Sequence, residues 1–157
     1  MKVLDRVSND LQGMRVYQEF IDRYEKGAPW AGYTDLEVQG RYQALVPLLS
    51  PDQFAWAAEQ SLERFSPQNR MLFGQYIQQQ AQEVGLRIPE IEEVDEVANF
   101  GDCAMLARVL GHIRQERPEM PANLLSCREG ILNSLLLKAA LAGITAYGAK
   151  TLIREKR

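Results

Sequence analysis

Apolar side chains recur every three or four residues along nearly the whole chain, which is the spacing of α-helices and not of β-strands. The first apolar stripe ends before Gly27 and has these members: Val7, Leu11, Met14, Tyr17, Phe20, Ile21 and Tyr24. Because a stripe with this period covers one face of a helix, the segment is predicted to be an amphipathic helix.

Start and stop signals divide the next residues into further helices. Thr34–Glu37 has the pattern of a capping box and predicts a helix from about residue 35 to the proline at 47. Ser50–Pro51 and Ser66–Pro67 each place a capping serine before a proline at the first helical position. The first of these two helices is predicted to bury Phe54, Ala57, Ala58, Ser61 and Leu62. The second is predicted to bury Met71, Leu72, Tyr76 or Phe73, Ile77 and Ala81, and to close at Gly85.

After Gly85 the character of the sequence changes. Residues 87–101 contain Glu90, Glu92, Glu93, Asp95 and Glu96 and are predicted to be an acidic linker. Asp102 is the predicted cap of the next helix, whose inward residues are Leu106, Val109, Leu110 and Ile113. Pro118 and Pro121 predict a loop, and a long helix is predicted to follow from residue 123 or 128 towards the end.

These elements predict an all-α fold with two parts. Residues 1–86 form an N-terminal four-helix unit, and residues 87–101 form the acidic linker. Residues 102–157 form a C-terminal helical hairpin, whose long hydrophobic terminal helix covers residues 130–154.

The stretch SLLLKAALAGITAYGAK, residues 134–150, is apolar on nearly every side of a helical wheel. A helix of this kind is buried, either in protein or in lipid. From Ile131 to Ile153 it measures about 34 Å, which is long enough to cross a membrane. Lys138 opposes insertion, because a lysine near the middle of a span costs about 2.5–3.5 kcal/mol. Insertion as a single span is therefore marginal.

Small residues on this helix indicate close packing with another helix. Ala139 and Gly143, with Ala142 and Ala146, form two overlapping small-xxx-small pairs. The neighbour can come from the same chain, from a second copy or from a different protein. Because the first 85 residues can form their own core, we expect the last helix to need a partner. The predicted partner-binding residues are Leu135, Lys138, Ala139, Ala142, Gly143, Ala146, Tyr147 and Lys150.

Composition and charge limit the classes of function. The chain has 157 residues, of which 46% are hydrophobic and 25% are charged, as in one ordinary globular domain. A net charge of −3 disfavours general nucleic-acid binding. The first residues lack the apolar run of a signal peptide, so we expect a cytoplasmic protein.

Candidate chemistry is sparse. His112 is the only histidine, and with Cys103 and Cys127 it makes an incomplete metal-ligand set at unconvincing spacing. The acidic run lacks the glycine of a calcium loop, and no glutamate stands three residues before His112 as in di-iron bundles. Nucleophile-elbow, phosphate-loop and dinucleotide motifs are also absent from the sequence. We therefore expect neither an enzyme nor a cofactor.

The sequence predicts a non-catalytic assembly or adaptor subunit that docks through its C-terminal helix into a larger protein complex or a homo-oligomer. The alternative is a peripheral or tail-anchored protein that uses the same helix at an anionic membrane surface. A small ligand-binding helical protein is the third hypothesis.

Overall fold

The computed structural model describes residues 11–26, 34–88, 102–125 and 131–155, and within these ranges every regular element is a helix. The elements are α2 (Leu11–Lys26), α3 (Asp35–Leu45), the short 3₁₀ helix η1 (Val46–Leu48), α4 (Pro51–Glu63), α5 (Pro67–Glu83), α7 (Cys103–Glu116), α8 (Met120–Leu125) and α9 (Ile131–Glu155). The predicted all-α fold with a long apolar final helix is confirmed.

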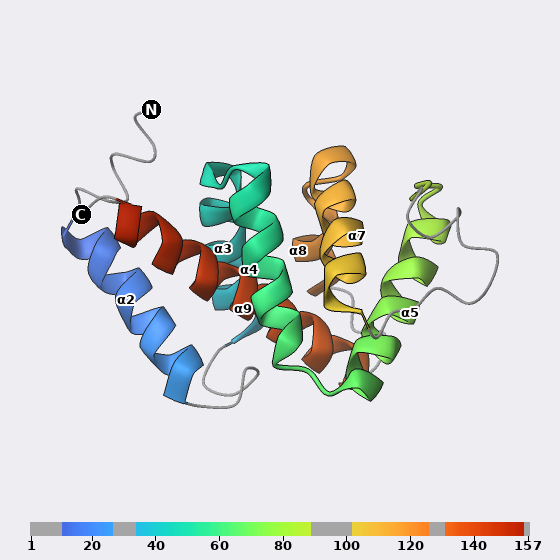
Figure 1. Cartoon of the computed structure of the whole chain (residues 1–157), viewed down its shortest axis with the longest axis horizontal. Coiled ribbons are helices and arrows are strands. Elements are labelled where there is room, and N and C mark those ends of the chain that lie inside the picture. The colour runs from blue at the N-terminus through green and yellow to red at the C-terminus, as the bar shows by residue number, and fades with distance from the viewer. Residues whose placement is uncertain (1–10, 27–33, 89–101, 126–130, 156–157) are drawn as a thin grey trace.

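The centre of the molecule is α9, the last helix in the sequence. Figure 1 shows α9 crossing the middle of the fold, with α4 lying across it and with α2 and α5 towards opposite ends. α3 and α8 also pack against α9, whereas α7 packs mainly against α4. Residues 139–146 of α9 are all buried, as expected for a helix that is apolar nearly all round.

Residues on both sides of the predicted linker share one hydrophobic core. Phe20, Tyr24 and Phe54 from the first part are fully buried together with Leu137 and Leu141 from α9. In this fold the residues before and after the linker are therefore packed as one body. The acidic run 90–96 lies outside the described residues, and independent folding of residues 1–86 stays a prediction.

Capping chemistry sets the helix starts where the sequence predicts them. Ser50 Oγ accepts from Gln53 N at 3.1 Å, and Gln53 Oε1 accepts from Ser50 N at 2.8 Å, which completes a capping box. Ser66 caps α5 and Asp102 caps α7 in the same way, through their side-chain oxygens. These bonds satisfy backbone N–H groups that have no partner inside the helix.

The Thr34–Glu37 box is formed only in part. Thr34 Oγ1 accepts from Glu37 N at 3.1 Å, and α3 begins at Asp35 as predicted. The Glu37 carboxylate instead accepts hydrogen bonds from the Arg23 guanidinium of α2. Because a charged donor is a stronger partner than a backbone amide, Glu37 links two helices rather than closing its own cap.

Two local predictions were wrong. Leu72 is 36% exposed, because the buried stripe of α5 starts at Phe73 and continues through Tyr76, Ile77, Gln80 and Ala81. The segment with Pro118 and Pro121 is not only a loop, since it contains α8. Pro121 is the second residue of α8, where an N–H group would have no intrahelical acceptor, so proline is tolerated.

Candidate docking groove between α2 and α4

The small residues of α9 pack inside the chain. Ala139 and Ala142 are fully buried, and Ala146 is nearly so. A Cβ atom added at Gly143 would lie 2.0 Å from Ser61 Oγ of α4 and 2.6 Å from the Tyr24 hydroxyl of α2. The close approach expected from the small residues therefore involves α4 and α2 of the same chain, and these four positions cannot meet a partner unless the core opens.

Lys138 and Leu135 lie near the start of α9. Lys138 Nζ stands 3.5 Å from Asp35 Oδ1, and only 13% of the lysine side chain is exposed. Asp35 is the first residue of α3, where the helix dipole favours a carboxylate. Leu135 is half-buried. The ion pair fixes the start of α3 against α9 within the chain.

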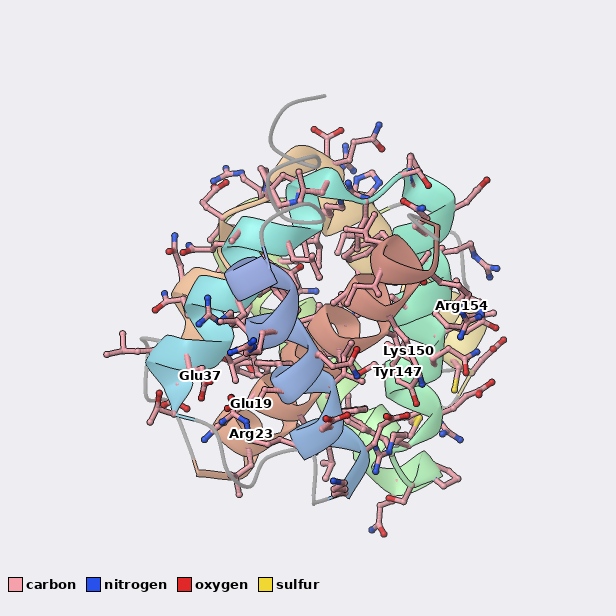
Figure 2. All side chains as sticks on the ribbon, turned by 90° about the vertical axis from the view of Figure 1, so that its left-hand side faces the viewer. Glu19, Arg23, Glu37, Tyr147, Lys150 and Arg154 are labelled. Carbon is pink, nitrogen blue, oxygen red and sulfur yellow. The ribbon has the colours of Figure 1, made fainter. Side chains whose placement is uncertain are left out.

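One stripe of α9 remains open to solvent at its C-terminal end. Tyr147, Lys150, Thr151 and Arg154 are half-buried or exposed, while Ala146, Ala149, Leu152 and Ile153 are buried. The open positions are spaced by three, four and seven residues, which places them on one face of the helix. Figure 2 shows Tyr147 and Lys150 between the ribbons of α2 and α4, with Arg154 farther out on the α4 side. We call these four residues the open stripe.

Aromatic contacts fix the inner end of the open stripe. The Tyr147 ring makes edge-to-face contacts with Tyr24 of α2 at 5.6 Å and with Trp56 of α4 at 5.7 Å between centroids. Such pairs contribute about 0.5–1.5 kcal/mol beyond the area they bury. Tyr24 is fully buried, but Trp56 keeps 41% of its surface exposed. Trp56 therefore offers a rigid apolar surface at the edge of the groove.

Charged groups surround the outer end of the groove. Lys150 Nζ bonds Glu25 Oε2 of α2 at 2.7 Å, with 35% and 49% of the two side chains exposed. A hollow of about 410 Å³ lies between α4 and the end of α9 and is lined by Asp52, Gln53, Trp56, Thr151 and Arg154. No ion pair joins Arg154 to a described residue, so its guanidinium is available to a carboxylate from outside.

A second charged cluster lies on the other side of α2. Arg23 interacts with Glu37 of α3 and stands 3.6 Å from Glu19 on its own helix, as Figure 2 shows. The hydrogen bond from Arg23 lowers the pKa of Glu37 below its ordinary value. Because the Arg23 guanidinium pairs with the Glu37 carboxylate, the cluster joins α2 to α3.

The residues considered for metal chemistry do not come together in the described ranges. Cys103 and His112 lie nine positions apart on α7, about 13 Å along the axis at about 1.5 Å per residue. Burial raises the pKa of the Cys103 thiol, which keeps it protonated. Cys127 lies outside the described residues. Among those described, no three His, Cys, Asp or Glu side chains are grouped for a metal ion.

Sequence reasoning named Tyr147 and Lys150 but missed the other residues of this groove. Thr151 and Arg154 could have been found, because they continue the polar stripe of α9 at helical spacing. Trp56 follows Asp52 by one helical turn on α4, on the side away from Ala57 and Ala58. Its exposure was not predictable, since an aromatic side chain at helical spacing is more often buried.

The described residues include one helix long and apolar enough to cross a membrane, Leu135–Arg154. Of that window, 72% is buried inside the molecule. A core helix of a soluble protein has the same properties, and in this fold the chain itself covers α9.

No protein-family model, no curated protein and no solved structure matches this chain. A function for the groove is therefore argued from the contacts and charges described above.

Proposed function

We propose that this chain is a non-catalytic adaptor or assembly protein, and that its partner docks in the groove between α2 and α4. The partner is a protein segment that places an apolar side chain on Trp56 and a carboxylate on Arg154. The observation that carries the proposal is the open stripe, a line of half-buried and exposed residues on a helix that is otherwise buried from residue 139 to residue 153.

The surface has the composition of a binding hot spot. Trp, Tyr and Arg are enriched where binding energy is concentrated in protein interfaces, and all three types occur here as Trp56, Tyr147 and Arg154. The Trp56 ring is held in place by Tyr147, so little side-chain entropy is lost when a partner covers it. The rest of α9 acts as the support that fixes these residues.

Arg154 favours a carboxylate on the partner, even though Asp52 lines the same hollow. Lys150 is already paired with Glu25, and Arg154 is exposed at the end of α9. A cation near a helix C-terminus is favoured by the helix dipole, so Arg154 is well placed as a fixed positive group. A carboxylate from a partner would gain a charge-assisted hydrogen bond with Arg154.

The test is selection of a random peptide display library on the full chain, followed by affinity measurement by calorimetric titration. We expect selected peptides to carry Asp or Glu near an apolar residue. Trp56→Ala and Arg154→Glu should each weaken binding by about tenfold or more. Arg15→Glu, an exposed position elsewhere on α2, is the matched control and should bind normally.

Charge reversal makes the test stricter. Peptides whose acid is replaced by Lys should bind Arg154→Glu better than they bind the wild type. The proposal is wrong if the selected peptides bind all variants equally or carry no acidic preference. It is also wrong if light scattering finds a dimer that Trp56→Ala dissociates, since the groove would then be filled by a second copy.

A further inference from the structure

A second hollow lies on the other side of α4, between α4 and α7. These two helices pack side by side, as Figure 1 shows. The hollow has a volume of about 510 Å³, which is within the usual range for small-molecule sites. Its lining residues are Pro51, Phe54, Arg108, Gly111, His112, Arg114 and Gln115.

The lining is cationic in a protein that is acidic overall. Arg108 and Arg114 contribute two positive charges, and none of the lining residues is acidic. The whole chain has a net charge of −3. Glu116, the one acid on α7, is not among the lining residues. The positive potential of the hollow is therefore not cancelled by its own walls.

Arg114 forms a fixed wall of the hollow. Its guanidinium donates to the carbonyl oxygens of Val46, Leu49 and Ser50, at the end of η1 and the start of α4. It also lies 5.0 Å from the centre of the Phe54 ring. These contacts hold the charge rigidly in the wall of the hollow, where the planar guanidinium is a surface on which a flat ligand can stack.

Arg108 and His112 supply groups that the fold does not use. They lie four residues apart on α7, with Gly111 and Gln115 on the same face. Neither Arg108 nor His112 makes a hydrogen bond or ion pair with a described residue. Gly111 leaves room between them, because a Cβ atom there would meet nothing within 4 Å.

We infer that this hollow binds a small organic anion, with a carboxylate or phosphate group attached to a flat apolar body. The anionic group contacts Arg108 and His112, and the apolar body lies against Pro51 and the planar Arg114 guanidinium beside Gly111. This site is independent of the groove between α2 and α4.

The test is calorimetric titration of the full chain with 2-naphthoate and 2-naphthyl phosphate, and with neutral 2-naphthamide as the control ligand. We expect the anions to bind and the amide to bind at least about tenfold more weakly. Tighter binding of 2-naphthoate would identify the ligand as a carboxylate, and tighter binding of 2-naphthyl phosphate would identify it as a phosphate. No heat of binding with either anion, or equal binding of the amide, would overturn the inference.

Two variants locate the site. Gly111→Leu fills the hollow with a good helix former, and Arg108→Gln removes an exposed charge; each should weaken 2-naphthoate binding by about tenfold or more. Arg15→Gln, at an exposed position on α2, should leave 2-naphthoate binding unchanged. Undiminished binding by Gly111→Leu and Arg108→Gln would place the anion elsewhere and refute the site.

Discussion

Gly143 of α9 lies so close to Ser61 of α4 that a Cβ atom on the glycine would stand 2.0 Å from the serine Oγ. The hydroxyl cannot simply rotate away, because Ser61 Oγ donates to the buried Ala140 carbonyl at 3.0 Å. We expect Gly143→Ala to lower the free energy of unfolding by about 1–3 kcal/mol, the usual cost of overpacking a core. Urea denaturation measures this change.

Ser61→Gly in the same chain is the matched test of the contact. It removes both serine atoms that the new Cβ would meet, so the double variant should lose less than the sum of the single losses. Strict additivity of the two changes would contradict the close contact between α9 and α4.

Tyr24 is predicted to make the fold sensitive to alkali. Burial raises its pKa to about 12, and its buried hydroxyl has no hydrogen-bond partner among the described residues. Above about pH 10 the unfolded chain loses the phenolic proton while the folded chain keeps it, so stability falls as the pH rises towards 12. Tyr24→Phe should be as stable as the wild type or more stable at neutral pH.

The same variant should also lose less stability between about pH 9 and about pH 11, as measured by thermal unfolding. The decrease of stability with rising pH will not disappear in this variant, because burial also raises the pKa values of Tyr17 and Tyr42. A marked loss of stability in Tyr24→Phe at neutral pH would mean that the hydroxyl is satisfied and that this account is wrong.

The Arg23–Glu37 pair is predicted to stabilise the fold above acidic pH. The hydrogen bond from Arg23 lowers the pKa of Glu37 from its ordinary value of 4.5. The pair therefore contributes fully above about pH 5, and the contribution is lost as the pH falls through the folded-state pKa. Glu37→Gln should have a lower free energy of unfolding than the wild type at about pH 7, and the two values should lie closer together at about pH 3.

Glu19→Gln is the control for this pair, since that side chain is 69% exposed and its distance from Arg23 is 3.6 Å. Surface pairs of this kind contribute about 0–1 kcal/mol. If both variants showed the same loss and the same pH dependence, Glu37 would have no special role between α2 and α3.

Two glycines are predicted to respond in opposite directions to alanine. Gly40 lies inside α3, and a Cβ atom there meets nothing within 4 Å, so Gly40→Ala should stabilise the fold by about 0.5–1 kcal/mol. Gly85 ends α5 with φ of +72°, a conformation that L-residues rarely adopt. Gly85→Ala should therefore destabilise it. Thermal unfolding midpoints measure both changes. If the midpoints of Gly40→Ala and Gly85→Ala shifted in the same direction, the different roles of the two glycines would be contradicted.

Helix starts were predictable from sequence because caps are local. Ser50, Ser66 and Asp102 bond backbone groups two or three residues away, so their roles need no knowledge of the tertiary fold. The partial Thr34 cap shows the limit of local reasoning. Glu37 bonds Arg23, fourteen residues earlier, and only the packing of α2 and α3 against α9 brings the two together.

The neighbour of α9 was not predictable for a related reason. Ala139 and Gly143 specify close approach, but small residues do not identify the helix that approaches. Ser61 and Tyr24, which contact Gly143, lie about eighty or more residues earlier in the chain. Likewise, Tyr147 and Lys150 were expected to bind a partner together with the small residues, whereas the small residues are buried in the core and these two belong to the open stripe.

The position of α9 has a consequence for how the protein is made. A ribosome synthesises α2, α3, α4 and α5 well before the helix that lies between them. Their apolar faces, including Phe20 and Phe54, stay uncovered until residues near Ile153 emerge. We therefore expect the nascent chain to complete this fold only after α9 has emerged from the ribosome, and chaperones that hold exposed apolar surface to bind it until then.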